Sequence, residues 1–220
     1  TTDAAFVGYL QFFTAFFTLF LPTLVLSALG ILSLYVYGAM EYGIYHMLDY
    51  VIFLGGRRIL KITSIGNNKL MRHRLSILVF FMLFSFLWSA IEKFGYPHWF
   101  DPFLDENEFL TLGLPRDFFV MAAAFVEFTL VYVLLTGRNV VVLGAIALNA
   151  LIIAGALYFG KVDALGHFLV MVILVIMTIK STDTAPILAY KEGRSALLQG
   201  GYMVLGYWTA LALFFALYYG

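Results

Sequence analysis

Long apolar runs separated by short polar segments make up most of this chain. A helix needs about 20 apolar residues to cross the hydrocarbon of a bilayer. Turn-forming residues such as Gly137, Gly160 and Pro186 stand between the runs, as expected of links between helices. Five runs have the length of membrane spans: about 75–94, 117–136, 140–158, 163–180 and 197–219.

The N-terminal region predicts a sixth span. Residues 4–37 are apolar almost throughout, and Pro22 can kink a membrane helix without ending it. From Glu41 the pattern predicts a two-faced helix over 41–57, suited to the membrane surface or to a polar bundle interior. We predict one long span followed by a surface helix; the alternative is a seventh span over 38–55. The apolar face of the 41–57 helix holds Ile44, Met47, Leu48, Val51, Ile52 and Leu54, and the polar face holds Tyr42, Tyr45, His46, Asp49, Tyr50 and Arg57.

Composition places the chain among membrane proteins. Hydrophobic residues make up 63% of the sequence and charged residues 12%. A soluble core of 220 residues could not bury that much apolar surface. The net charge is zero, which argues against nucleic-acid binding. The absence of cysteine excludes disulfides, thiolate metal sites and catalytic thiols. We therefore predict an all-α polytopic transmembrane bundle of about six spans, or seven in the alternative, plus an amphipathic surface helix.

Basic residues predict the orientation, because cytoplasmic loops are enriched in Lys and Arg. The segment 57–74 carries six basic residues and no acid, so we place it in the cytoplasm. Alternation of the spans then puts ten basic residues inside and three outside. The acidic loop 95–116 falls on the exoplasmic side. No basic residue precedes the first apolar run, so we expect no signal peptide. We expect a bacterial or archaeal cytoplasmic membrane.

A single carboxylate, Glu127, lies in the middle of the run 117–136. A charge in hydrocarbon costs several kcal/mol, so such a residue usually faces a partner, a cavity or a ligand. The short link 137–139 makes the next helix an antiparallel neighbour, and counting about eleven residues from it along each helix puts Glu127 beside Asn149. Two interpretations stay open: a neutral acid that joins two helices through Asn149, or one that handles protons or contacts quinone.

A second polar cluster is expected at the outer ends of two spans. Its members are Glu92, Lys93, His98, Asp163 and His167. Asp163 and His167 are four residues apart and share a helix face. Two imidazoles with nearby carboxylates suit Cu or Zn. His98 also fits an interfacial anchor beside Trp99, and a hydrogen-bonded helix contact explains His167, so we predict no resident metal.

The polar face of the 41–57 helix is the third candidate. Its members, with the arginines that follow, are Tyr42, His46, Asp49, Arg57 and Arg58. Two-histidine haem ligation needs a second histidine at the depth of His46, and the predicted topology places none there. We expect this face to bind an anionic lipid headgroup, with the arginines supplying charge, or to contact a partner subunit.

Several short motifs resemble the DoxX-like family of membrane proteins. They are Arg74 at the entry to a span, Ile91-Glu92-Lys93-Phe94, Ala123-Ala124-Phe125-Val126-Glu127, Leu134-Leu135-Thr136-Gly137 and Asp163-Ala164-Leu165-Gly166-His167. The resemblance covers about 72–180 and implies a four-helix module in which Lys93, Glu127 and His167 are of interest. That family is related to the DoxD subunit of thiosulfate:quinone oxidoreductase and to the methylamine-utilisation protein MauE.

The chain departs from a four-helix module at both ends. We divide it into 1–71 (first span, amphipathic helix and basic segment), 72–180 (DoxX-like module) and 181–220 (cytoplasmic loop and final span). The outer loop also interleaves aromatic and acidic residues, which suits a surface helix on the membrane or against a partner. Its large apolar residues are Trp99, Phe100, Phe103, Leu104 and Phe109, and its acids are Asp101, Asp105, Glu106 and Glu108.

These features predict an accessory subunit of a multi-subunit redox or respiratory-type membrane complex. Such a subunit would bind other membrane subunits and lipid or quinone, without resident cofactor and without catalytic activity of its own. One alternative is a quinone-linked oxidoreductase subunit acting on sulfur compounds, as the DoxD resemblance implies. A second is a small membrane transporter, for which the sequence shows no inverted repeats.

Overall fold

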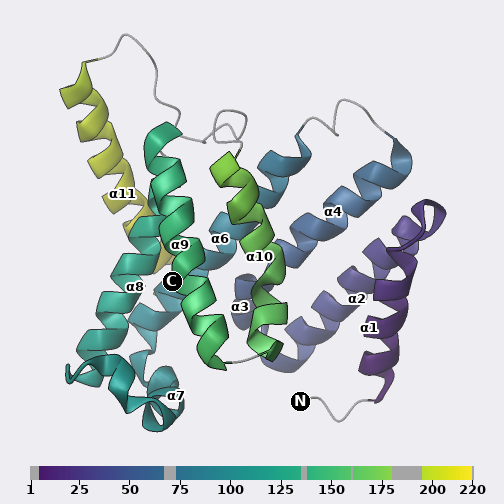
Figure 1. The fold of residues 1–220 in the computed structure, drawn as a ribbon, viewed down its shortest axis with the longest axis horizontal. Helices are drawn as coiled ribbons and strands as arrows, with labels where there is room; N and C mark the ends of the chain where they lie inside the picture. The colour runs from purple at the N-terminus through teal and green to yellow at the C-terminus, as the bar shows by residue number, and fades with distance from the viewer. Residues whose placement is uncertain (1–4, 67–72, 135–137, 160, 180–194, 220) are drawn as a thin grey trace. The chain divides into compact units, whose positions relative to one another are not determined.

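The protein is all-α, with ten α-helices among the residues that the structure describes (Figure 1). The computed structural model describes 5–66, 73–134, 138–159, 161–179 and 195–219, without the side chains of 103, 138–141, 151, 154–159, 161–166, 196, 218 and 219. The helices are α1 (Ala5–Phe17), α2 (Leu24–Tyr42), α3 (Ile44–Met47), α4 (Ile52–Ile65), α6 (Arg74–Gly95), α7 (Asp101–Glu106), α8 (Arg116–Val133), α9 (Arg138–Phe159), α10 (Lys161–Ile179) and α11 (Ala196–Tyr219). Short 3₁₀ turns are η1 (Leu21–Thr23), η2 (Leu48–Tyr50), η3 (Pro97–Phe100) and η4 (Glu108–Thr111).

This is an integral membrane protein. Within the described residues, three helical segments are long and apolar enough to cross a bilayer: Leu21–Tyr42, Arg74–Gly95 and Leu197–Leu217. Shorter apolar helices cover Ala5–Phe17 and His167–Ile179. The five runs predicted from the sequence after residue 74 are confirmed as the helices α6, α8, α9, α10 and α11.

The prediction of one long kinked span over 4–37 was wrong, because the chain turns back on itself. α1 ends at Phe17, and α2 begins at Leu24 and packs beside it. Pro22 lies in the intervening 3₁₀ turn and offers no backbone N–H to continue a helix. The hydroxyl of Thr23 donates to the carbonyl of Phe17 (2.8 Å), which satisfies an acceptor at the end of α1. The two helices therefore form a hairpin.

Small side chains bring the two helices of this hairpin close together. The hydroxyl of Ser27, which is fully buried, donates to the carbonyl of Thr14 across the interface (2.9 Å). Gly30 lies directly against the Thr14 side chain, and a Cβ atom at Gly30 would overlap the Thr14 hydroxyl. Close approach at small residues is the usual way in which membrane helices pack.

The predicted helix over 41–57 is also interrupted, so its predicted extent was wrong. Gly43 ends α2 with a φ of 89°, a backbone conformation that residues with a side chain rarely adopt. The chain then forms α3 and η2 before α4 begins. α4 returns alongside α2, with Gly55 packed against Phe81 of α6. The Ser85 hydroxyl accepts a hydrogen bond from the backbone N–H of Ile52 (3.1 Å).

The chain divides into two compact units, Thr1–Ser85 and Phe86–Gly220, so α6 contributes to both. In the second unit α8 and α9 are neighbours, as the short link between them predicts, and α9 packs along α10. The hydroxyl of Tyr132 on α8 donates to the carbonyl of Met203 on α11 (2.7 Å). Its core includes fully buried side chains from α6, α8, α9 and α10: Trp88, Ile91, Phe128, Leu148 and Leu174.

Candidate functional site

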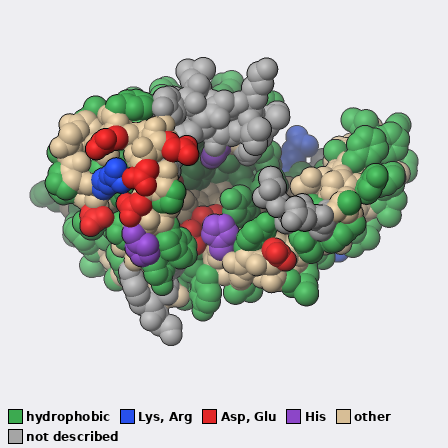
Figure 2. Space-filling model, turned by 90° about the horizontal axis from the view of Figure 1, so that it is seen from below, with side chains coloured by type: hydrophobic (Ala, Val, Ile, Leu, Met, Phe, Trp, Pro, Cys, Tyr) green, Lys and Arg blue, Asp and Glu red, His purple; other side chains and the backbone are tan. Residues whose placement is uncertain are grey.

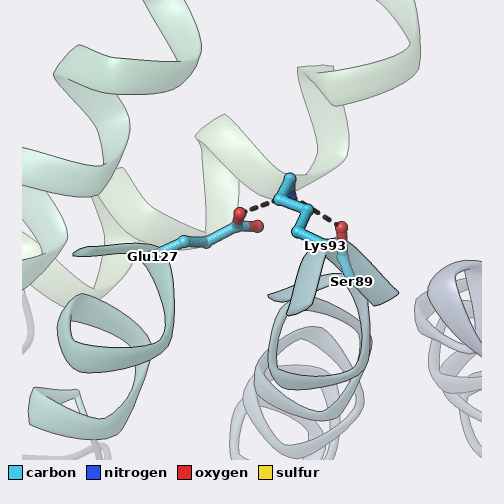
Figure 3. A network of polar contacts seen from close by, with 3 residues as sticks. All are labelled: Ser89, Lys93 and Glu127. Atoms are coloured by element: carbon cyan, nitrogen blue, oxygen red, sulfur yellow. Dashed lines mark hydrogen bonds and ion pairs between the residues drawn. The ribbon is translucent and has the colours of Figure 1, made fainter. Parts of the chain in front are cut away.

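An ion pair joins α6 to α8 inside the second unit (Figure 3). The ammonium of Lys93, near the end of α6, binds one carboxylate oxygen of Glu127. The side chains of Lys93 and Glu127 are only 18% and 12% exposed, respectively. The sequence alone paired Glu127 with Asn149 and did not predict this counter-charge.

The Lys93 ammonium makes three contacts, with Glu127, Ser89 and the ring of Phe100. Besides Glu127, it donates to the hydroxyl of Ser89 one turn earlier on α6 (3.1 Å). It also lies 5.6 Å from the centre of the Phe100 ring, within the range of a cation–π contact. A desolvated ammonium is tolerated when its donors are engaged in this way. The arrangement holds two helices and η3 together around one charge.

Asn149, the partner that the sequence predicts for Glu127, is not bonded to it. The side-chain carbonyl oxygen of Asn149 is buried and has no hydrogen-bond partner among the described residues. The count from the link along α8 and α9 placed the two residues at one depth, but Glu127 pairs instead with Lys93, near the end of α6. Phe94, next to Lys93, makes an edge-to-face contact with Phe125 at 4.7 Å between ring centres. The first turns of α8 therefore extend past α6 and pack against η3.

The other members of the predicted outer cluster have separate surroundings. Glu92 is buried on α6, and His98 is exposed with its ring against Tyr96 (5.9 Å between centres). His167 is half-buried, and the side chain of Asp163 lies outside the described residues. Lys93 belongs to the ion pair and not to a metal-ligand set, since an ammonium has no lone pair to offer.

The segment between α6 and α8, residues 96–115, combines acidic and apolar side chains. Arg116, the first residue of α8, forms an exposed ion pair with Asp105. That hydrogen bond and the charges of Asp105, Glu108 and Asp101 raise the pKa of Arg116 further above its already high ordinary value. Figure 2 shows acidic side chains grouped around a basic one over the part of the second unit that holds α7. Large apolar side chains of the same segment are exposed: Trp99, Phe109, Leu112 and Leu114.

The first unit contains a pocket of about 960 Å³ between α1, α2, α3 and η2, reaching the first turn of α4. Three members of the predicted polar face, Tyr42, His46 and Tyr50, line this pocket. The rings of Tyr42, His46 and Tyr50 follow one another along its wall, with centres 6.4 and 6.0 Å apart. The Tyr35 hydroxyl donates to the carbonyl of Met47 (2.9 Å) and fixes α3 against α2.

The remaining members of that predicted face lie outside the lining of the pocket. Asp49 is half-buried and Arg58 is exposed. Arg57 is half-buried, and its Nε atom is buried without a hydrogen-bond partner in the described part of the chain.

Sequence reasoning missed the α1 side of the pocket. Gln11, Thr14 and Thr18 all line it; Gln11 and Thr14 share one face of α1, and Thr18 directly follows the end of that helix. Three polar residues at this spacing within an otherwise apolar run are a signal that could have identified this face.

Comparison with protein-family models, with curated proteins and with solved structures finds no match for this chain. The resemblance to the DoxX-like family therefore stays a prediction from the motifs.

Proposed function

We propose that this protein is an accessory integral membrane subunit of a multi-subunit redox or respiratory-type complex, and that it binds partner subunits and lipid or quinone. The redox character is taken from the DoxX-like resemblance. The observation that carries the accessory role is the surface of the outer segment, residues 96–115, which exposes large apolar side chains among acids.

The composition of this surface favours a protein partner over the membrane. Leu112 is 85% exposed and Trp99 is 52% exposed. Exposed apolar groups of this size mark interaction surfaces. A bilayer with anionic headgroups would attract basic residues, whereas this segment carries Asp105, Glu106 and Glu108. An apolar centre with an acidic rim suits a partner with a basic rim.

The ion pair of Lys93 and Glu127 supports a non-catalytic role. Each charge is engaged by the other, and Ser89 and Phe100 complete the surroundings of the ammonium. A group that must bind or release protons needs access to another donor or acceptor. We therefore assign the pair to helix assembly and not to proton transfer.

We propose seven spans, the alternative to six, with 66–74 in the cytoplasm, the basic residues Arg57, Arg58 and Lys61 at the cytoplasmic end of the second span, and 95–116 outside. α4 returns along α2, so α3, η2 and α4 together run back across the same depth of membrane. α1, with 13 residues, is about 20 Å long and shorter than the hydrocarbon. The seven segments are α2, 44–65, α6, α8, α9, α10 and α11; the second replaces the 38–55 of the sequence-based alternative, because α2 continues to Tyr42.

Single cysteines test this topology directly, because the chain has none of its own. Ser64→Cys should react with an impermeant thiol reagent only after cells are opened, and Glu108→Cys should react in intact cells. Glu41→Cys distinguishes the two span counts. With seven spans it reacts from outside, whereas with one N-terminal span and a surface helix it is protected.

Association in mild detergent tests the accessory role. The tagged chain should migrate on native gels with other polypeptides. Reversing the acids of the outer segment, Glu106→Lys with Glu108→Lys, should weaken that association. Lys61→Glu, on the opposite predicted side of the membrane, is the matched charge-reversal control and should leave it intact. A stable monomer with full activity in isolation would refute the accessory role.

A further inference from the structure

The pocket in the first unit has the size and lining of a ligand site. Small-molecule sites have volumes of about 300–1,000 Å³ and combine an apolar lining with a few polar groups. This pocket is at the upper end of that range, with about 960 Å³. It lies among helices of which one, α2, is part of a candidate membrane span. A ligand that enters it from the bilayer must itself be soluble in lipid.

The polar side chains that line the pocket carry hydroxyl, amide or imidazole groups. None of the described residues that line it is Lys, Arg, Asp or Glu. A phosphate or carboxylate headgroup would lose its hydration here without gaining a counter-charge, which is costly in an apolar setting. Hydroxyl, amide and imidazole groups instead match an uncharged oxygen-bearing headgroup. The chemistry of the lining therefore selects against anionic lipids.

A buried hydroxyl lies on the α1 side, packed against Gly30 of α2. Thr14 is 8% exposed, and its hydroxyl has no partner among the described residues, although it lines the pocket. On another wall, the ring series Tyr42, His46 and Tyr50 offers both flat surfaces and hydrogen-bonding groups.

We propose that this pocket binds an uncharged, lipid-soluble amphiphile. Its oxygen-bearing headgroup lies against Tyr42, His46 and Tyr50, and its hydrocarbon tail runs between α1 and α2. An isoprenoid quinone and a diacylglycerol share this chemistry. The inference rests on the lipid- or quinone-binding part of the proposed function, but it concerns the chain alone and requires no partner subunit.

The test uses the purified full-length chain in nanodiscs of phosphatidylcholine. The probe is an azido-substituted benzoquinone with an isoprenoid tail, and labelled peptides are mapped by mass spectrometry. We expect labelling within residues 7–53, and competition by unlabelled quinone, by diacylglycerol or by both. The stronger competitor of the two, quinone or diacylglycerol, identifies the ligand that fits the pocket better. Labelling confined to other parts of the chain, or equal competition by phosphatidylglycerol, would overturn the proposal.

Two variants make the site assignment specific. Gly8 lines the pocket, and a Cβ atom there meets nothing within 4 Å, so Gly8→Leu should fill the space without disturbing the fold. Gly56→Leu is the matched control, because Gly56 also has open space but does not line the pocket. We expect at least a tenfold loss of labelling in the first variant and no loss in the second. Equal labelling of both variants would contradict the proposal.

His46→Phe tests the headgroup end even if Gly8→Leu fails to fold. It keeps an aromatic ring in the series and removes the ring nitrogens, so Kd for the quinone should rise by about threefold to tenfold, the equivalent of one hydrogen bond. An unchanged Kd would overturn the headgroup assignment. If the chain migrates alone on native gels but is still labelled within residues 7–53, the accessory role is refuted while the proposed binding site stands.

Discussion

Lys93 lies two residues before the end of α6, and its ammonium pairs with Glu127, eleven residues into α8. Eleven residues of helix measure about 16 Å, so the first turns of α8 continue well beyond the end of α6. The outer segment occupies the space beside those turns, where η3 packs on α8 and carries Phe100 over the ammonium. The ion pair is thus the point at which two helices and the outer segment meet.

Removing one partner of this ion pair should destabilise the second unit more than removing both. Breaking a buried pair leaves an uncompensated charge, at a cost of about 3–5 kcal/mol when burial is complete. Because the two side chains stay 18% and 12% exposed, we expect about 1–3 kcal/mol for Lys93→Met or Glu127→Gln. The double variant Lys93→Met/Glu127→Leu should recover much of that loss. Unfolding in mixed micelles, followed by circular dichroism, measures each value.

Ser89→Ala is the control for this comparison. It removes a charge-assisted hydrogen bond from Lys93 and leaves the ion pair, so its cost should be about 0.6–1.7 kcal/mol, from the average to the upper end for intramembrane hydrogen bonds. The result for Glu127→Gln also separates the two assignments of this acid. If Gln leaves stability unchanged while the activity of a host complex is lost, the assignment to helix assembly fails.

The sequence identified both members of this pair but not their contact, and the reason is geometric. A three-residue link forces α8 and α9 together, so that neighbour relation could be predicted. The link from α6 to α8 is about twenty residues long and leaves the relative height of the two helices open. The count from the link between α8 and α9 considered only partners on α9, and therefore matched Glu127 with Asn149 instead of Lys93. Long connections fix topology but not register.

The N-terminal hairpin was missed for a different reason. Pro22 is compatible with either a kink or a chain reversal, and hydropathy does not distinguish them. The chain reversal is stabilised by the Thr23 hydroxyl, which donates to the carbonyl of Phe17, and by Gly30, whose missing side chain lets Thr14 approach. Such contacts are specific to the packed state. The apolar length of the region could be predicted, whereas the direction of its chain could not.

Gly30→Ala should destabilise the hairpin of α1 and α2. The added methyl group would overlap the Thr14 hydroxyl, and overpacking of this kind costs about 1–3 kcal/mol. Alanine also favours helix over glycine by about 1 kcal/mol, which offsets part of the loss. Gly8→Ala is the control, since a Cβ atom at Gly8 meets nothing within 4 Å and should be neutral or stabilising. Thermal unfolding in detergent compares the two; a lower Tm for Gly8→Ala than for Gly30→Ala would contradict this account.

The ion pair of Arg116 and Asp105 should respond to salt but not to moderate alkali. A cation whose pKa is raised by folding stabilises the fold at every pH below its unfolded pKa, and loses that effect only as pH rises through the folded value. For Arg116 both values lie above the working range, so raising pH from 7 to 10 should leave its contribution unchanged. Salt at 1 M reduces the screening length to about 3 Å and should weaken this exposed pair.

Hydrogen exchange of the outer segment measures that response. Protection of residues 101–116 should fall in 1 M salt in the natural chain. Asp105→Asn should show low protection at both salt concentrations, because the pair is absent. If salt changes protection equally in both proteins, the ion pair does not hold this segment.

Tyr132 and Gly206 should show strong coupling in a double-mutant cycle. The Tyr132 hydroxyl donates to the carbonyl of Met203, and a Cβ atom at Gly206 would come within 2.6 Å of that same hydroxyl oxygen. Tyr132→Phe removes one hydrogen bond and should cost about 0.5–1.5 kcal/mol. Gly206→Ala should cost more, because the methyl group forces the hydroxyl away from α11.

In the double variant the hydroxyl is gone and the next ring atom, Cζ, is 3.8 Å from the new methyl group, an ordinary contact. The double variant should therefore be no less stable than Gly206→Ala alone. Strict additivity of the two losses would mean that α8 and α11 do not approach each other through this hydroxyl.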